Sequence, residues 1–124
     1  MRALVGAATG GEPFFFFGSD SAPHPIESKA KHVGVCAGVY TQSHAIAYLA
    51  EIFDSVDKLD NLVKFVSTNG LAFYGISEKD SVNKDKAVLV KRENNVPDRI
   101  GNSALTVVPF KAGEKLQYAV EWRS

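Results

Sequence analysis

The 124 residues carry 14 basic and 14 acidic side chains, which gives a formal net charge of zero, and 45% of the residues are hydrophobic. A chain with this charge balance lacks the positive electrostatic field that nucleic-acid-binding domains and proteins of anionic membranes use. Its partner is therefore expected to be a small molecule or a protein. No stretch reaches the roughly 20 apolar residues of a membrane span, no signal-peptide pattern is present, and the single cysteine, Cys36, excludes an internal disulfide. We therefore expect a cytoplasmic protein that binds neither membrane nor nucleic acid.

A helix is expected over residues 1–8, because Leu4 and either Ala7 or Ala8 stand at helical spacing and a Gly-Gly pair at 10–11 follows as a stop. The helix lacks an N-cap residue, so we expect Met1 to be an internal residue of a longer protein or the start of a truncated gene model. The run of four Phe residues at 14–17 cannot alternate between core and solvent, which predicts a strand buried on both faces, as in a parallel sheet covered by helices.

The residues that follow this predicted strand are candidates for chemistry. Gly18 and Ser19 let the backbone leave the strand, and Asp20 then stands where a buried strand surfaces, which is the catalytic end in barrel enzymes. Prolines on both sides of His24 stiffen the loop around its imidazole. The alternatives are a turn-forming or helix-capping aspartate and a solvated histidine.

The remaining chain is predicted to form helices and then strands. Residues 26–38 are expected to form a polar, then Gly-rich loop. An amphipathic helix is expected over about 40–59, with an apolar stripe of Ile46, Leu49, Ala50, Phe53 and Val56. A second helix over 59–68 would stop at Asn69-Gly70. One further turn at 71–76 would be anchored by Phe73, Tyr74 and Ile76.

Strands are expected at 87–90, 104–108 and 116–122. In the last of these Leu116, Tyr118, Val120 and Trp122 alternate with polar or small residues, which predicts one buried face. Tyr118 and Trp122 are interpreted as packing anchors.

Residues 18–24 (GSDSAPH) and 34–38 (GVCAG) closely resemble the last barrel strand and the following loop of the dihydroorotases. The wording of the first motif is similar to the short monofunctional type of bacteria and fungi. Further segments resemble the C-terminal region of this family, particularly its fungal members: YLAEIF at 48–53, FVSTNG at 65–70, FYG at 73–75 and VPFKAGE at 108–114.

The resemblance implies an α/β fold that is the C-terminal portion of a TIM (β/α)8 barrel. A complete barrel takes about 250 residues, so the fold is incomplete as given. Residues 1–76 would be the end of the barrel, with the last strand, the site loop and the following helices. Residues 77–124 would be a C-terminal extension of short strands packed on the barrel. Family members are commonly dimers, which implies a homodimer for the full-length protein.

The resemblance also implies zinc-dependent, reversible cyclisation of N-carbamoyl-L-aspartate to dihydroorotate, a step of pyrimidine (UMP) biosynthesis catalysed by members of the amidohydrolase superfamily. Asp20 corresponds to the aspartate that binds zinc and acts as general acid/base. His24 corresponds to the histidine that touches the substrate carboxylate, and Ala37 to a residue whose backbone contacts the ring.

Other parts of the family's site have no counterpart in this sequence. The family's His-x-His pair, carbamylated lysine, two further histidine ligands, and the arginine and asparagine that hold the substrate cannot be assigned. His24, His32 and His44 are well separated, and only His24 falls on a family position. A non-catalytic truncated remnant or interaction module is therefore the alternative, and another metal-dependent amidohydrolase is a third reading. The lone Cys36 is interpreted as a small loop residue rather than a metal ligand or nucleophile.

Overall fold

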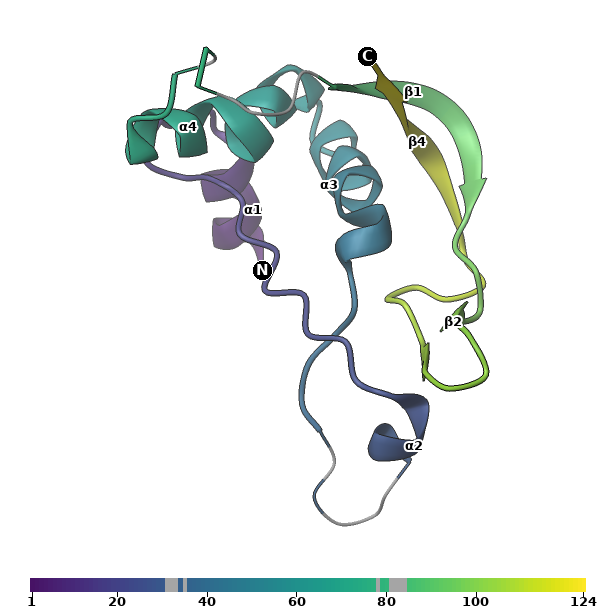
Figure 1. Cartoon of the computed structure of the whole chain (residues 1–124). Helices are drawn as coiled ribbons and strands as arrows, with labels where there is room; N and C mark the ends of the chain where they lie inside the picture. The colour runs from purple at the N-terminus through teal and green to yellow at the C-terminus, as the bar shows by residue number, and fades with distance from the viewer. Residues whose placement is uncertain (31–33, 35, 78, 81–84) are drawn as a thin grey trace.

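The structure is a computed structural model that describes residues 1–30, 34, 36–77, 79–80 and 85–124. The helical elements are α1 (Arg2–Thr9), α2 (Ile26–Lys29), η1 (Gln42–His44), α3 (Ala45–Asp54), η2 (Leu59–Asn61), η3 (Lys64–Thr68) and α4 (Asn69–Tyr74). The strands are β1 (Lys86–Asn95), β2 (Ile100–Gly101), β3 (Thr106–Val107) and β4 (Lys115–Arg123). In Figure 1 the helices α1, α3 and α4 and the β1/β4 ribbon form one end of the molecule, and the segment with α2 extends away from them.

The core lies between α3 and the β1/β4 ribbon. The predicted stripe places Ala50 and Phe53 of α3 inward, and both are fully buried. On β4 the alternation predicted for residues 116–122 points Leu116 and Tyr118 to the same core, with exposures of 0% and 3%. The two periodicities, 3.6 residues for the helix and 2 for the strand, thus produce the two faces that pack together.

The amphipathic helix predicted over 40–59 is confirmed in type but is shorter. A 3₁₀ turn, η1, precedes α3, and α3 ends at Asp54. Val56 lies beyond the helix end and is 41% exposed, so its assignment to the buried stripe was wrong. The helix expected over 1–8 is confirmed as α1.

The strands β1 and β4 pair in antiparallel fashion, with Leu89 opposite Val120 and an irregularity between Lys91 and Asn94. Trp122 is 66% exposed near the end of this ribbon, so it is not the packing anchor that was expected. The predicted strand at 104–108 is reduced to the two residues of β3, paired with β2.

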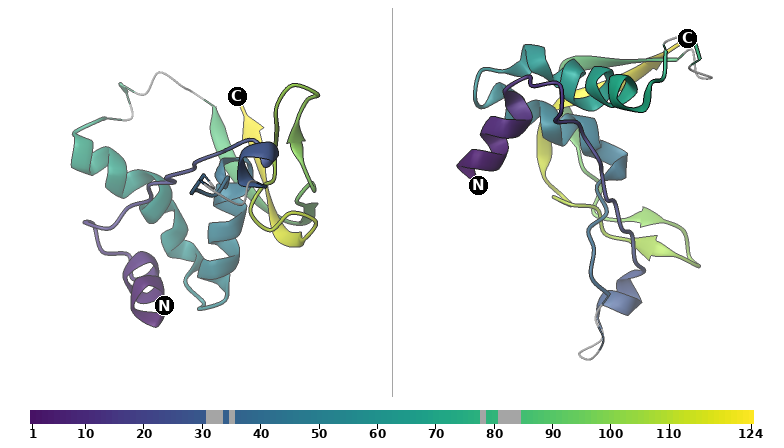
Figure 2. Two further views of the ribbon diagram at one scale, coloured as in Figure 1. Left: turned by 90° about the horizontal axis from the view of Figure 1, so that it is seen from below. Right: turned by 90° about the vertical axis from the view of Figure 1, so that its left-hand side faces the viewer.

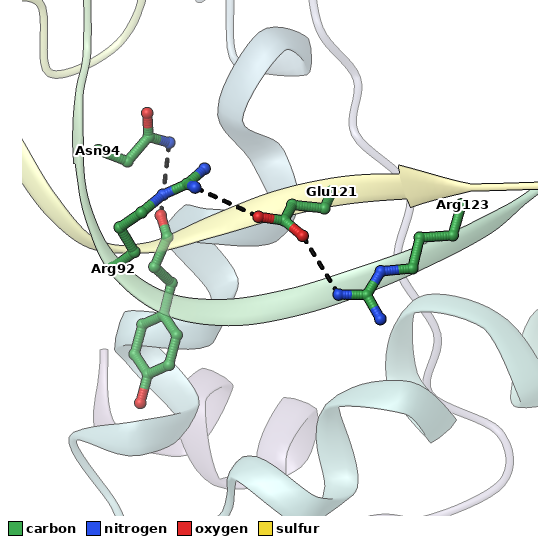
Figure 3. A network of polar contacts seen from close by, with 5 residues as sticks. Arg92, Asn94, Glu121 and Arg123 are labelled. Atoms are coloured by element: carbon green, nitrogen blue, oxygen red, sulfur yellow. Dashed lines mark hydrogen bonds and ion pairs between the residues drawn. The ribbon is translucent and has the colours of Figure 1, made fainter.

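Charged side chains of β1 and β4 form ion pairs along the ribbon (Figure 3). Glu121 accepts from Arg92 at 3.2 Å and from Arg123 at 3.3 Å. The Nδ2 amide of Asn94 donates to the Tyr118 carbonyl across the ribbon at 3.4 Å. Because the three charged side chains are more than a third exposed, each ion pair contributes only about 0–1 kcal/mol.

The prediction of a buried strand at 14–17 is wrong for this chain. No strand forms there, and Phe14 and Phe15 are 66% and 41% exposed. An interior strand needs a hydrogen-bonded neighbour on each side, and no strand of the described residues pairs with this segment. The Phe17 N–H instead donates to the Phe65 carbonyl at 2.8 Å. The Phe16 ring packs against Phe73, with 5.1 Å between ring centroids.

The Asn69-Gly70 pair does not stop the second helix. Within the predicted span, η2 and the π-helical η3 form, and α4 continues directly from η3. The helix ends at Tyr74, and the next residue, Gly75, has a left-handed φ of 66°. Asn69 is buried, and its Nδ2 donates to the carbonyls of Glu12 and Phe15, at 2.9 Å each. The pair therefore makes a tertiary contact that fixes the segment before Asp20.

Two smaller expectations also need correction. The segment after His24 is not loop throughout, because Ile26–Lys29 forms one helical turn, α2, directly after Pro25. Phe73 and Tyr74, expected to anchor α4, are 68% and 67% exposed. His32 lies outside the described residues. In the part of the chain that the structure describes, the helices are too short or too polar to cross a bilayer.

Candidate active site

Two segments distant in sequence meet at the loop that carries Asp20 and His24. The Ala22 N–H donates to the Val39 carbonyl at 3.0 Å. The Ser21 hydroxyl accepts the N–H groups of Thr41 and Gln42 at 3.1 and 3.2 Å. These N–H groups lie at the start of η1, where main-chain donors lack helical partners. Ser21 therefore ties the Asp20 loop to the helical segment that leads into the core helix α3. The right-hand view of Figure 2 shows the two chain segments running side by side.

Asp20 stands in the left-handed region, with a φ of 43°, and its side chain is exposed. Asp adopts this region more readily than most residues, and positive φ values outside glycine concentrate at functional sites. The carboxylate is therefore presented to solvent from a backbone that the Ser21 hydrogen bonds hold in place.

His24 is half-buried, and the chain of Gly38 lies directly against its loop. A Cβ built on Gly38 would stand 2.6 Å from the Ala22 Cβ and 3.5 Å from Cδ2 of the His24 ring. Gly38 has a φ of 121°. Only a residue without a side chain fits this close approach. Ala37, which is exposed, is thereby held next to the His24 loop.

A cavity of about 200 Å³ opens beside this contact. Apart from His24, its lining residues were not candidates from the sequence. It is lined by His24, Lys29, Gly38, Val39, Tyr40, Val108, Pro109 and Phe110. Residues 108–110 of this lining come from the C-terminal part of the chain. They are held there because the Phe110 N–H donates to the Tyr40 carbonyl at 2.8 Å. The Tyr48 hydroxyl of α3 donates to the Phe110 carbonyl. Burial raises the pKa of Tyr48, and the nearby Glu114 carboxylate raises it further, so this hydroxyl keeps its proton.

Lys29 is the polar group of this region that sequence reasoning missed. Its ammonium donates to the Cys36 carbonyl at 3.3 Å and to the Gly38 carbonyl. Cys36 itself is half-buried, and its carbonyl, not its thiol, makes this contact. A lysine nine residues before a glycine gives no local pattern, so only the fold shows the contact.

A zinc site cannot be assembled from the described residues alone. Among them no three His, Cys, Asp or Glu side chains gather in a way that could hold a metal ion, and a zinc ion needs at least three protein ligands. The structure therefore brings the Asp20, His24 and Ala37 segments together without grouping Asp20 with further ligands.

Comparison with known proteins shows which sequences this chain is similar to. No family model matches the chain. Over 122 residues it is 49% identical to dihydroorotase of Saccharomyces cerevisiae, an alignment that covers 98% of this chain and 34% of the yeast protein. It is 41% identical to dihydroorotase of Alkalilimnicola ehrlichii, with 96% of this chain and 33% of that protein covered.

Solved structures give the same result for the fold. The crystal structure of dihydroorotase from Saccharomyces cerevisiae in complex with 5-fluoroorotic acid matches with a TM-score of 0.95 at 49% identity, covering 98% of this chain and 34% of that one. Dihydroorotase from Campylobacter jejuni matches with a TM-score of 0.78 at 34% identity, covering 97% of this chain and 33% of that one. The chain thus spans about a third of the length of these relatives, and its helices and strands are a partial chain of their fold. Over nearly its whole length the chain is therefore similar to a C-terminal portion of the dihydroorotases.

Proposed function

We propose that the chain is the C-terminal part of an enzyme that reversibly cyclises N-carbamoyl-L-aspartate to dihydroorotate in pyrimidine biosynthesis. The observation that carries the proposal is the docking of the Asp20–His24 loop on residues 36–42, in a chain that matches the yeast fold with a TM-score of 0.95. That yeast structure holds 5-fluoroorotic acid, a ring carboxylic acid, which supports a ligand of the same kind here.

The proposed roles divide between proton transfer and binding. In ring opening a water oxygen bonds to the amide carbonyl carbon, the carbon–nitrogen bond breaks, and the leaving nitrogen gains a proton. Asp20 is exposed, so its carboxylate can accept the proton of the attacking water and deliver it to that nitrogen. In cyclisation the same proton moves in reverse.

The substrate is held beside this carboxylate. His24 lines the 200 Å³ cavity and donates a ring N–H to the substrate carboxylate. Ala37, next to Gly38 at the His24 loop, offers its main chain to the ring. Both groups bind and orient, which raises the rate by positioning the amide near Asp20.

Zinc is the cofactor expected for the family, and Asp20 the ligand that this chain would supply. When bound, zinc lowers the pKa of water and polarises a carbonyl. The described residues do not complete a zinc site, so further ligands would have to join Asp20.

The proposal includes the architecture and setting of the whole enzyme. Residues 1–76 would belong to the end of a (β/α)8 barrel and residues 77–124 to an extension packed on it. The full-length protein would be a cytoplasmic homodimer whose ligand is a small molecule. The alternative of a remnant or interaction module without catalysis is favoured by one observation, the lack of a metal-ligand cluster among the described residues.

A chimera tests the activity. The matching third of yeast dihydroorotase is replaced by this chain, and the opening of dihydroorotate is followed spectrophotometrically. We expect turnover, and a loss of about 10²–10⁴-fold in Asp20→Asn, as for removal of a general acid/base. The control is Asp60→Asn, an exposed aspartate of η2, which should retain activity. A chimera that folds and carries zinc yet fails to open dihydroorotate would contradict the proposal.

The transcript upstream of the Met1 codon separates the enzyme from the remnant. An in-frame extension that encodes a His-x-His pair, a lysine and two further histidines supports an enzyme. Stop codons directly upstream would favour the remnant.

A further inference from the structure

We infer that Lys29 is a positioning residue that fixes the main chain around Ala37 for ligand binding, an inference that rests on the proposed function. Lys29 is the last residue of α2, and its ammonium donates to the carbonyls of Cys36 and Gly38, the two neighbours of Ala37. The Cys36 carbonyl belongs to the peptide unit before Ala37, and the Gly38 carbonyl belongs to the peptide unit after Gly38. The two hydrogen bonds therefore restrict the main chain on both sides of the Ala37–Gly38 pair.

The other side of the same segment is held by the Asp20–His24 loop. Gly38 approaches Ala22 so closely that a Cβ there would stand 2.8 Å from the Ala22 carbonyl oxygen. The next residue, Val39, accepts the Ala22 N–H at 3.0 Å. Residues 36–39 are therefore clamped between the Lys29 ammonium and the main chain of Ala22.

The chemistry suits a lysine at this place. Carbonyl oxygens accept strongly from a charged donor, and an ammonium has three donors on a flexible stem. Two of these donors reach the carbonyls of Cys36 and Gly38. Among the described residues, no main-chain hydrogen bond links α2 to this segment. Lys29 also lines the cavity that contains His24, so the clamp adjoins the place proposed for the substrate.

The binding test uses the yeast chimera with Lys29→Met, which keeps most of the aliphatic stem and removes the ammonium. A positioning role predicts that KM for dihydroorotate rises about tenfold, a change worth about 1.4 kcal/mol, while kcat stays within about threefold. Lys29→Arg should restore most of the binding, because the guanidinium can also donate to two oxygens. Lys64→Met, at an exposed lysine of η3, is the matched control and should leave KM unchanged.

A second readout does not require activity. Amide hydrogen exchange in the 124-residue chain reports the Ala22 N–H, which donates to Val39, and the Val96 N–H, which donates to the Glu114 carbonyl at 2.9 Å. Lys29→Met should speed exchange at Ala22 and leave Val96 unchanged.

The two readouts separate the inference from the proposed function. A chimera without turnover removes the proposed function, while exchange at Ala22 still decides the role of Lys29. Exchange at Ala22 that is equal in the parent and in Lys29→Met, or an Ala22 N–H unprotected in the parent, overturns the inference. So does a KM in Lys29→Met equal to that of the Lys64 control.

Discussion

The glycine that joins the two site segments, Gly38, provides a sharp test of the site geometry. In Gly38→Ala the new Cβ would stand 2.6 Å from the Ala22 Cβ and 2.8 Å from the Ala22 oxygen. Its φ of 121° is also a conformation that residues with a side chain rarely adopt. The substitution therefore combines steric overlap with backbone strain.

The loss of stability in Gly38→Ala follows from the backbone strain and the steric overlap together. A sparsely populated backbone conformation costs about 1–3 kcal/mol, and overpacking a close contact costs about 1–3 kcal/mol more. Together they exceed the roughly 1 kcal/mol that a single main-chain hydrogen bond contributes. The bond between Ala22 and Val39 should therefore break, and residues 36–39 should move away from His24.

The assay is kcat/KM for dihydroorotate in the yeast chimera, with the free energy of unfolding measured in urea. A displacement of about 1 Å at a positioned group costs about 100-fold, so we expect kcat/KM to fall by about that factor. The matched control is Gly34→Ala, where φ is 71° but no atom of the described residues, chain neighbours apart, lies within 4 Å of the added Cβ. It carries strain without overlap and should lose much less activity.

A partial rescue identifies the overlapping atom. Adding Ala22→Gly removes the methyl at 2.6 Å but leaves the carbonyl oxygen at 2.8 Å, so some activity should return to Gly38→Ala. If Gly38→Ala kept kcat/KM within threefold of the parent, the close approach of the two loops would be refuted.

Three further predictions concern stability. Asn69→Ala removes an amide that donates to two carbonyls at 2.9 Å and should lower the free energy of unfolding by about 2 kcal/mol, measured in urea against the exposed control Thr68→Ala. Ser21→Ala leaves two main-chain N–H groups without their acceptor and should cost about 1–2 kcal/mol, with faster amide exchange at those two positions. Burial lowers the pKa of His44 below its unfolded value of 6.5, so the folded state binds fewer protons and stability should fall as pH decreases from about 6.5 through the folded pKa. Urea titrations across that range should show the slope in the parent and a flatter one in His44→Gln, and an identical slope in both would exclude His44 as its source.

Local sequence patterns predicted the elements that pack through their own periodicity. The spacing of Ala50 and Phe53 and the alternation of Leu116 and Tyr118 identified α3, β4 and the faces that form the core, because side-chain direction repeats with a period set by the backbone. The loop motif also named Asp20 and His24 as candidates, through its resemblance to a family. Their catalytic roles stay predictions.

Tertiary structure alone decided what the Phe run and the Asn-Gly pair do. A continuous apolar run is compatible with an interior strand only when other strands flank it, and here Phe16 packs on α4 instead. Asn69-Gly70 is a residue pair typical of a helix C-terminus. In the fold, however, the buried side-chain amide of Asn69 donates to the Glu12 carbonyl, before the Phe run. Local composition cannot distinguish these outcomes, because each depends on which distant atoms are available as partners.

The assembly of the candidate site was likewise set by contacts between residues far apart in the sequence. The sequence alone named Asp20 and His24 as candidates and predicted that prolines stiffen the loop around His24. Only the fold decided that Ser21 binds the start of η1, that Gly38 meets Ala22, and that Lys29 reaches the carbonyls beside Ala37. Hydrogen bonds and close packing act over a few ångströms of space, whatever the separation of the residues along the chain. The sequence therefore shows which residue types are present, but it does not show which distant residues come into contact.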